Sequence, residues 1–148
     1  MDIQIRGATA ADAAEAVDAL RRSIAELCVA DHQHDPTELE GWLGNKTVAG
    51  WQQWIARDDA MVLVAERDSK IVGVGMATLG GEILLNYVHP EARFGGVSKA
   101  ILAAIEAKLR LQDVQRCQLE STVTARSFYE RRGFHSEVEG SRILTKPL

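Results

Sequence analysis

Residues 61–88 constrain the fold of this chain more than any other stretch. They contain three apolar runs, "MVLVAE", "IVGVGMATL" and "EILLNYV", separated only by "RDSK" and by two adjacent glycines. Connections this short leave room for tight turns alone, so the runs predict a three-stranded antiparallel meander. In the middle run, Gly73, Gly75 and Ala77 share one face with Ile71, and a face so small lets a helix or large side chains pack closely.

Strand and helix patterns precede this meander. The run "IQIR" predicts a strand, and apolar residues at helical spacing predict an amphipathic helix over residues 10–28, which starts at a pair resembling a capping box, Thr9 and Asp12. The segment "DHQHDP" breaks this helix. Asp35 and Thr47 then each precede a further helical segment.

After the meander the patterns alternate between helix and strand. Residues 97–111 predict a long helix, "RCQLEST" predicts a strand, and residues 124–132 predict a helix that Gly133 ends as a left-handed cap, with Phe134 placed to fold back onto it. "FHSEVE" and "RILTK" predict a final hairpin. Strand, helix and strand around residues 97–111 imply a right-handed parallel crossover. The sequence therefore predicts an α/β (α+β) fold with a mixed, mostly antiparallel central sheet flanked by helices.

Composition limits the size and the partners of the protein. Its 148 residues are the length of one ordinary domain, so residues 1–148 are predicted to form a single domain. The net charge of −4 gives no electrostatic reason to expect binding to nucleic acid or to an anionic membrane. The sequence has no membrane-span or signal-peptide pattern, and Cys28 and Cys117 stand apart from any metal or disulfide pattern. Reduced thiols in a cytoplasmic protein are predicted.

The stretch "NYVHPEARFGGVSKAIL", residues 86–102, joins a strand to a helix through two glycines and a serine. The first N–H groups of a helix are unsatisfied, and the helix dipole adds about half a positive charge there. Glycines let an anion approach these amides, and Arg93 adds a charged fork. A Walker pattern is absent, and "GVGMAT" lies within a strand with Thr78 in place of the third glycine of a dinucleotide site. The sequence thus predicts a phosphate site at this turn, although a plain tight turn would use the same glycines.

Two segments resemble the signatures of one family, the GCN5-related N-acetyltransferases (GNAT). "VHPEARFGGVSKAIL" is similar to the family's motif A, Gln/Arg-x-x-Gly-x-Gly/Ala, with Arg93, Gly96 and Ser98 at the marked positions. Ser98 replaces the usual Gly or Ala, and Phe94 replaces a common Gly, whose amide it can supply unless the turn needs a positive φ. "TARSFYERRGF" is similar to the end of motif B, Ala-x-x-Phe-Tyr-x-x-x-Gly-Phe. The element order also matches, so the resemblance covers nearly the whole chain.

The resemblance implies a sheet whose strands at 82–88 and 115–121 splay apart, with acetyl-CoA as cosubstrate in the V between them. Its pantetheine arm would pair with the first of these strands, and its pyrophosphate would lie on the amides of the glycine turn. The implied cofactor-binding residues are Tyr87, Val88, Arg93, Phe94, Gly95, Gly96, Val97, Ser98, Lys99 and Phe128. A core position would also explain Phe128.

The implied activity is that of an N-acetyltransferase, an acyltransferase in which the primary amine of a small molecule or protein attacks the thioester directly. A backbone N–H near Val88 would stabilise the oxyanion. Tyr129 would protonate the departing thiolate as general acid, although a half-buried packing role would also suit it. The alternative function is a non-catalytic acyl-CoA-binding or regulatory module that retains the fold.

The general base is left open among five residues. Glu82, Asp31, His32, His89 and Glu120 are all candidates, and an amine can instead lose its proton through waters.

The acceptor site is predicted from the family's usual arrangement, in which the segment after the first strand forms one wall of the acceptor cleft. Here that wall is residues 24–55, with Asp31, His32, His34 and Asp35 in an expected solvated loop and no metal site. Carboxylates beside tryptophans suit a cationic amine, although the tryptophans could equally be core. The acceptor itself stays unidentified, and a homodimer is left open.

Overall fold

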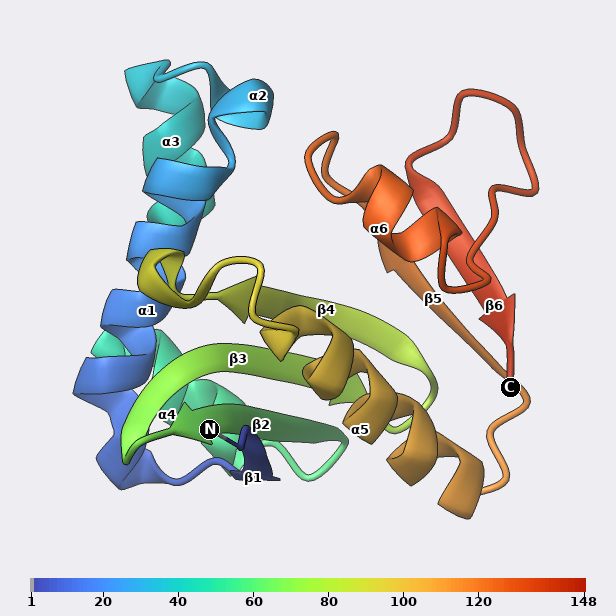
Figure 1. Ribbon diagram of the computed structural model, residues 1–148, viewed down its shortest axis with the longest axis horizontal. Coiled ribbons are helices and arrows are strands. Elements are labelled where there is room, and N and C mark those ends of the chain that lie inside the picture. Colours follow the sequence, from blue (N-terminus) through green and yellow to red (C-terminus); the bar gives the residue numbers. More distant parts are fainter. Residues whose placement is uncertain (1) are drawn as a thin grey trace.

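The computed structural model describes residues 2–148 and contains one six-stranded sheet whose strands lie in chain order (Figure 1). Neighbouring strands run antiparallel except β4 and β5, which are parallel as the predicted crossover requires. The strands are β1 (Gln4–Gly7), β2 (Ala60–Arg67), β3 (Lys70–Thr78), β4 (Glu82–Val88), β5 (Arg116–Glu120) and β6 (Ile143–Pro147). The predicted fold class is therefore confirmed.

Helices cover both faces of the sheet (Figure 1). They are α1 (Ala13–Leu27), α2 (Val29–His32), α3 (Pro36–Leu43), α4 (Val48–Ala56), α5 (Val97–Leu111) and α6 (Arg126–Glu130), with single 3₁₀ turns η1 (Ala10–Asp12) and η2 (Pro90–Ala92). α1 and α4 bury one face of β2–β4 in a core that includes Leu20, Trp51 and Val74. α5 covers the other face in a core that extends from Ile101 to Leu144 on β6.

The small face of β3 lets α5 approach closely, as the sequence predicts. A Cβ atom on Gly75 would lie 2.4 Å from Ile101 Cγ2, and one on Gly73 would lie 2.5 Å from Val97 Cγ1. Both separations are far shorter than van der Waals contact, so neither position has room for a side chain. Because α5 begins at Val97, directly after the glycine turn, this close packing also fixes where the turn lies relative to β4.

Gly75→Ala is expected to lower the free energy of unfolding by about 1–3 kcal/mol, the usual range for overpacking a core. The added methyl would have to displace Ile101, whose β-branched side chain has little rotamer freedom in a helix. Urea denaturation measures the change. Gly7→Ala on β1 is the matched control, because an added Cβ there meets no heavy atom within 4 Å. Equal losses in both variants would mean that strand propensity, and not contact with α5, decides the result.

β4 and β5 pair over two residues only. Glu82 pairs with Gln118 and Ile83 with Leu119. At the same level the register of β3 against β4 shifts by one residue, which leaves Leu84 outside the β3 pairing, and such a bulge bends a strand. Beyond Ile83 the two strands diverge (Figure 1), which is the splay that the family resemblance implies.

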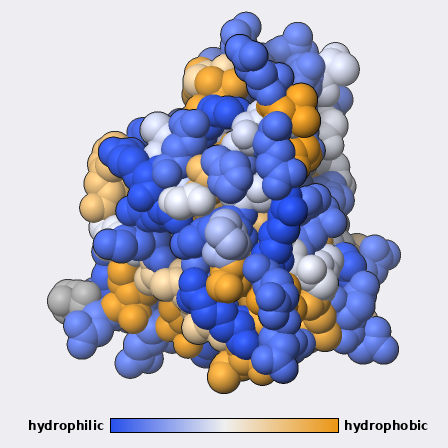
Figure 2. Space-filling model, turned by 90° about the vertical axis from the view of Figure 1, so that its right-hand side faces the viewer, coloured by the Kyte–Doolittle hydropathy of each residue, from blue (hydrophilic) through white to orange (hydrophobic). Residues whose placement is uncertain are grey.

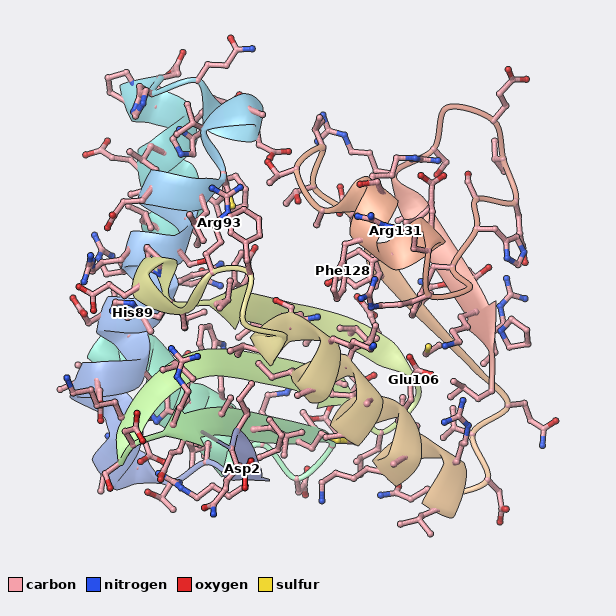
Figure 3. All side chains as sticks on the ribbon, in the orientation of Figure 1. Asp2, His89, Arg93, Glu106, Phe128 and Arg131 are labelled. Carbon is pink, nitrogen blue, oxygen red and sulfur yellow. The ribbon has the colours of Figure 1, made fainter. Side chains whose placement is uncertain are left out.

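Two groups of polar contacts join the strands on either side of this V. Near its closed end the carboxylate of Glu106 on α5, which is 5% exposed, accepts hydrogen bonds from Lys146 at 2.8 Å and from Arg110 at 3.2 Å (Figure 3). Across its open end the carboxylate of Asp31 on α2 accepts from the Val123 N–H and the Thr124 hydroxyl, each at 2.5 Å.

The predicted strand "FHSEVE", residues 134–139, does not form. One isolated bridge joins His135 to Thr145, and the following residues form a loop in which the Ser136 hydroxyl donates to the Val138 carbonyl. β6 pairs with β5 instead. Val138 is exposed, so this polar segment has no apolar face that a strand could bury. The predicted break "DHQHDP" is likewise partly wrong, because it overlaps the short helix α2.

The end of α6 follows the sequence prediction. Gly133 has a φ of +93°, the left-handed conformation expected of a helix cap. Phe134 is buried, and its ring lies edge-on to that of Tyr129 with centroids 5.5 Å apart.

The face of the molecule over the β5–β6 end is mainly hydrophilic, with hydrophobic residues in several separate groups (Figure 2). This view offers no large apolar surface that would support a dimer, and the homodimer stays a prediction, as does the cytoplasmic location. Within residues 2–148, each helix is too short or too polar to cross a lipid bilayer.

Candidate active site

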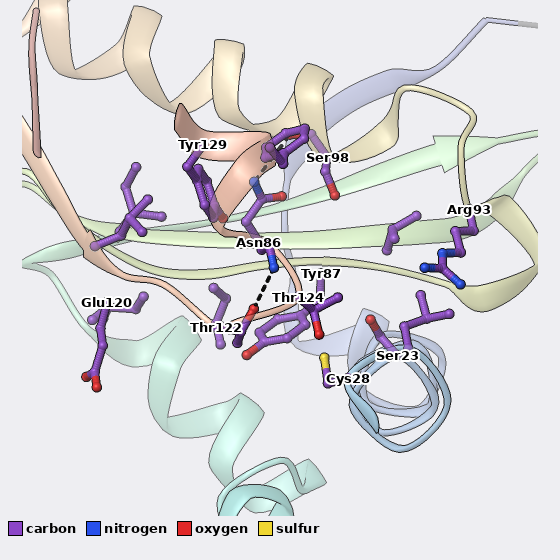
Figure 4. A pocket seen from close by; sticks show the side chains of 18 residues that line it. Ser23, Cys28, Asn86, Tyr87, Arg93, Ser98, Glu120, Thr122, Thr124 and Tyr129 are labelled. Carbon is purple, nitrogen blue, oxygen red and sulfur yellow. Dashed lines mark hydrogen bonds between the residues drawn. The ribbon is translucent and has the colours of Figure 1, made fainter. Parts of the chain in front are cut away.

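A cavity of about 230 Å³ lies where β4 and β5 separate (Figure 4). β4 forms one wall, the start of α6 and its preceding loop form another, and the C-terminal end of α1 forms a third. The polar and ionisable residues on these walls include Ser23, Cys28, Asn86, Tyr87, Arg93, Glu120 and Tyr129. Pockets for whole drug-sized ligands usually measure about 300–1,000 Å³, so this cavity suits the reacting ends of molecules.

One edge of β4 is open towards the cavity. The N–H of His89, the residue after Val88, donates to the Val72 carbonyl of β3 at 2.8 Å. Backbone groups alternate between the two edges of a strand, so Tyr87 also points its N–H towards β3. The N–H and C=O groups of Asn86 and Val88 therefore face the gap between β4 and β5, where an extended ligand could pair with them.

Asn86 links this strand to the first turn of α5. Its side-chain Nδ2 donates to the Ser98 carbonyl at 3.3 Å. Its Oδ1 is buried and finds no hydrogen-bond donor within the part of the chain that the structure describes. A buried acceptor without a partner is costly, so Asn86 presents the cavity with an acceptor that a ligand N–H would satisfy.

Tyr129 is held rigidly on the opposite wall. It is buried on α6 between two aromatic rings, with centroid distances of 5.1 Å to Phe128 and 5.5 Å to Phe134. Burial raises the pKa of Tyr129 to about 12, and the neighbouring Asn86 amide opposes this shift. At neutral pH the phenol is thus fully protonated and can only donate its proton. Phe128 lies on the cavity wall and is partly buried against the core, and its role in cofactor binding stays a prediction.

The glycine turn adopts left-handed conformations at two residues. Gly96 has a φ of +81° and Phe94 a φ of +66°, so the turn does need the positive φ that the motif's usual glycine supplies. Phe94 is 92% exposed and adopts this conformation at a cost of about 1–2 kcal/mol. No side chain caps α5, so the N–H groups of its first turn stay available to an anion.

A groove of about 330 Å³ continues from the cavity along this turn. Its walls are Val88, Ala92, Phe94, Gly96, Val97, Ser98, Lys99, Phe128 and Arg132. Val88, Ser98 and Phe128 also line the cavity, so the two spaces are adjacent. Val97 is buried and presents little surface to the groove. Gly95 is exposed and donates its N–H to the Ala92 carbonyl at 3.2 Å.

Arg132 is a groove residue that the sequence analysis did not single out. Its guanidinium stacks on the Phe128 ring at 4.0 Å, and its Nη1 donates to the Phe128 carbonyl. Its Nε is buried and has no acceptor among residues 2–148. Together with Lys99, it gives the groove two positive charges.

Arg93 lines the cavity and not the groove. Its side chain reaches from the turn towards the C-terminal end of α1 (Figure 3), with Cζ 4.6 Å from the centre of the Phe94 ring. Burial and the charge of Asp31 raise the pKa of the Cys28 thiol to about 11, and the positive charge of Arg93 opposes that shift. The guanidinium is therefore close to α1, a position that differs from the predicted one beside the amides of the turn.

The polar cluster after α1 is a solvated loop only in part, because His34 and Asp35 are exposed between α2 and α3, whereas Asp31 and His32 lie on α2. His32 is buried, with Nε2 2.9 Å from the Ile24 carbonyl oxygen and Nδ1 accepting from the His34 N–H. Asp31 binds the loop before α6, and Asp35 caps the first turn of α3. Both carboxylates accept hydrogen bonds from the protein but keep their negative charge, so the cationic acceptor site stays a prediction. Among the described residues, no three His, Cys, Asp or Glu side chains converge in a way that could hold a metal ion.

Of the five candidate bases, Glu120 lies on the cavity wall. His89 faces another hollow of the surface, where its ring contacts Arg22 and the Glu91 N–H. Glu82 lies at the closed end of the V, where β4 pairs with β5. The tryptophans were predicted either to form an acceptor wall or to lie in the core. Trp51 is buried in the core, whereas Trp42 donates to the Tyr87 hydroxyl at 3.3 Å beside the cavity.

Comparison with known proteins identifies a family whose model matches most of this chain. A family model described as "Acetyltransferase (GNAT) domain" matches residues 28–143. An "IAA acetyltransferase" of Azospirillum brasilense is 31% identical over 90 residues, which are 55% of this chain, and the match spans 59% of the length of that protein.

Two solved structures share the whole architecture. The crystal structure of PaiA N-acetyltransferase from Thermoplasma acidophilum in complex with coenzyme A superposes with a TM-score of 0.87 and 23% identity, over all of both chains. A GNAT family acetyltransferase from Brucella melitensis in complex with acetyl-CoA gives a TM-score of 0.70 and 19% identity, over 99% of this chain and 88% of the other. At such identities the likeness establishes the fold.

Proposed function

This chain belongs to the GNAT acetyltransferase family, and we propose that it transfers the acetyl group of acetyl-CoA to a primary amine, with Tyr129 as general acid. The observation that carries the proposal is the open edge of β4 facing the Tyr129 side chain across one cavity. A ligand paired with that edge would bring its reactive end within the same small space as a buried proton donor.

The residues around the cavity fit acetyl-CoA. The pantetheine arm is an extended chain with two amides, and Asn86 and Val88 offer it the free N–H and C=O groups of a strand edge. The Asn86 Oδ1, buried without a donor, would accept a further N–H from such an arm. Beside Tyr87 the cavity also has the apolar walls Leu27, Ile83 and Leu85, which suit an acetyl methyl group.

The groove fits the phosphates of the same molecule. Its floor is the uncapped first turn of α5 from Gly96 to Lys99, where N–H groups and the helix dipole favour negative charge. Arg132 and Lys99 add cations, and the unpaired Nε of Arg132 is a donor that a phosphate oxygen would satisfy.

The chemistry then follows from the positions of the side chains. Acetyl-CoA supplies an activated acetyl group, to whose carbonyl carbon the amine nitrogen bonds as the C–S bond breaks. A backbone N–H near Val88 on the open edge is the donor for the developing oxyanion. Tyr129 gives its proton to the departing sulfur, and Glu120 or a water takes the proton that the amine loses.

The test of this function is thiol release from acetyl-CoA with a panel of primary amines, each compared with a blank that contains no amine. We expect steady release, above the blank, with at least one amine and a matching amount of N-acetylated product by mass spectrometry. Tight acetyl-CoA binding by calorimetry together with release at the blank rate for every amine would instead indicate the non-catalytic acyl-CoA-binding module.

A further inference from the structure

The Arg93 guanidinium is a cation without a protein anion. Arg93 is exposed and lines the cavity at the end that α1 forms, and no carboxylate or carbonyl among residues 2–148 accepts a hydrogen bond from it. Its guanidinium stacks on the exposed ring of Phe94. A guanidinium carries five N–H donors in a fixed fork that matches a carboxylate or phosphate, so this side chain is arranged to receive an anion from outside the protein.

Ser23 supplies a second donor at the same place. Ser23 on α1 lies on the cavity wall, and no group within the described chain pairs with its hydroxyl. Figure 4 shows this hydroxyl and the Arg93 guanidinium pointing into the same end of the cavity. A hydroxyl at a cavity surface can donate to a ligand. Two unrelated elements thus direct unsatisfied donors at one point.

Arg93 and Ser23 line this end of the cavity and not the groove of the cosubstrate, although Arg93 stacks on the groove residue Phe94. The groove has its own cations, Lys99 and Arg132, and its own amides at the start of α5, whereas Arg93 and Ser23 do not line it. Figure 4 shows Glu120 and Arg93 at opposite ends of the cavity, with Asn86 between them. An amine that loses its proton near Glu120 would therefore extend its remaining atoms towards Arg93.

We propose that Arg93 and Ser23 form an anion subsite for the acceptor, so that the preferred substrate is an amine that also carries a carboxylate or a phosphate. This inference rests on the proposed acetyl transfer and names its substrate class. It is an alternative to the cationic acceptor predicted at Asp31 and Asp35.

The experiment compares amines that differ only in the anion. The pairs are γ-aminobutyrate with propylamine and δ-aminovalerate with butylamine, and phosphoethanolamine with ethanolamine distinguishes phosphate from carboxylate. The wild type is expected to show kcat/KM values about tenfold to hundredfold higher for the anionic member of a pair, the range for a charged hydrogen bond. Arg93→Gln should bring this ratio close to one, Ser23→Ala should reduce it in part, and Arg93→Lys should keep part of it.

A charge-matched control separates this effect from a general change of surface charge. Arg131→Gln on the exposed end of α6 (Figure 3) should leave the ratio unchanged. The affinity for acetyl-CoA, measured by calorimetry, should stay within about twofold in Arg93→Gln, since the subsite belongs to the acceptor.

Two results would overturn the inference. One is a wild-type ratio near one, or a ratio that persists in Arg93→Gln. The other is an affinity for acetyl-CoA that falls tenfold or more in Arg93→Gln while the ratio is retained, because Arg93 would then bind the phosphates of the cosubstrate. If the wild type acetylates none of these amines, calorimetry with γ-aminobutyrate in the presence of coenzyme A decides. Binding that Arg93→Gln abolishes would support the subsite and count against acetyl transfer, and no binding would overturn the subsite.

Discussion

Gly96→Glu is expected to weaken acetyl-CoA binding by at least about a hundredfold while the protein stays folded. Gly96 begins α5 in a left-handed conformation, and an added Cβ would meet no heavy atom within 4 Å, so the new side chain enters open space over the turn. There its carboxylate would occupy the groove and repel a phosphate at the same helix terminus that should attract it. Calorimetry with acetyl-CoA measures the loss.

Gly140→Glu is the matched control for that experiment. Gly140 has a φ of +80°, against +81° for Gly96, and is equally open, but it lies in the loop before β6. Both variants bear the same strain of about 1 kcal/mol for a side chain in the left-handed region and the same added charge. Only Gly96→Glu should lose affinity, and circular dichroism should show both variants folded. Unchanged affinity in folded Gly96→Glu would rule out the turn as the phosphate site.

Tyr129→Phe is expected to lower kcat by about a hundredfold or more, the usual contribution of a positioned acid. The affinity for acetyl-CoA should change little, because the aromatic contacts with Phe128 and Phe134 remain. Proton transfer from Tyr129, with its pKa of about 12, would be strongly uphill towards a free thiolate with a pKa of about 8.5. Burial and the charge of Asp31 raise the pKa of the Cys28 thiol on the same cavity wall, and burial of the departing sulfur would likewise reduce the difference.

The pH profile tests the same assignment. The donor is the protonated form of Tyr129, which is lost only as pH rises through about 12. The wild-type rate should therefore show no alkaline decline attributable to this group up to about pH 10.

Tyr87→Phe is the control for Tyr129→Phe, since Tyr87 is the other tyrosine of the chain and also lines the cavity. A large loss in Tyr87→Phe with wild-type turnover in Tyr129→Phe would move the acid to Tyr87.

Sequence periodicity predicted the sheet well because most of its strands are either fully buried or half-buried. A fully buried strand is a continuous apolar run and a half-buried strand alternates, and both patterns can be recognised in the sequence alone. The run from Met61 to Val88 is an example, since its turns are too short for any other connection. Residues 134–139 show the limit of this method. Their two apolar residues are Phe134, which is buried, and Val138, which is exposed, and which of them a neighbouring surface covers depends on the whole fold.

The residues of the candidate site likewise include some that the sequence could predict and others that it could not. Tyr129 and the glycine turn carry motifs, so they could be assigned from the sequence. Asn86 and Arg132 carry none, because what marks them is a buried atom without a partner, which only the three-dimensional arrangement creates. The sequence predicted that Arg93 lies at the turn. It could not predict the direction of the side chain, because that direction depends on where α1 ends.

Because β4 pairs with β5 over two residues only, most of the facing edges of these two strands have no strand partner. On the α1 side of the V, the central residues of β2 and β3 are buried on both faces, whereas β5, α6 and β6 are attached through the core under α5, the Glu106–Lys146 contact and Asp31. Segments with few attachments open locally at lower free energy than the rest of a protein. An extended ligand seated along Asn86 and Val88 would act as the missing strand and hold the two parts together. At a concentration of 100 times its Kd it would add about 2.7 kcal/mol to the stability of the folded state. The resistance of this protein to proteolysis would then rise with the concentration of its substrate.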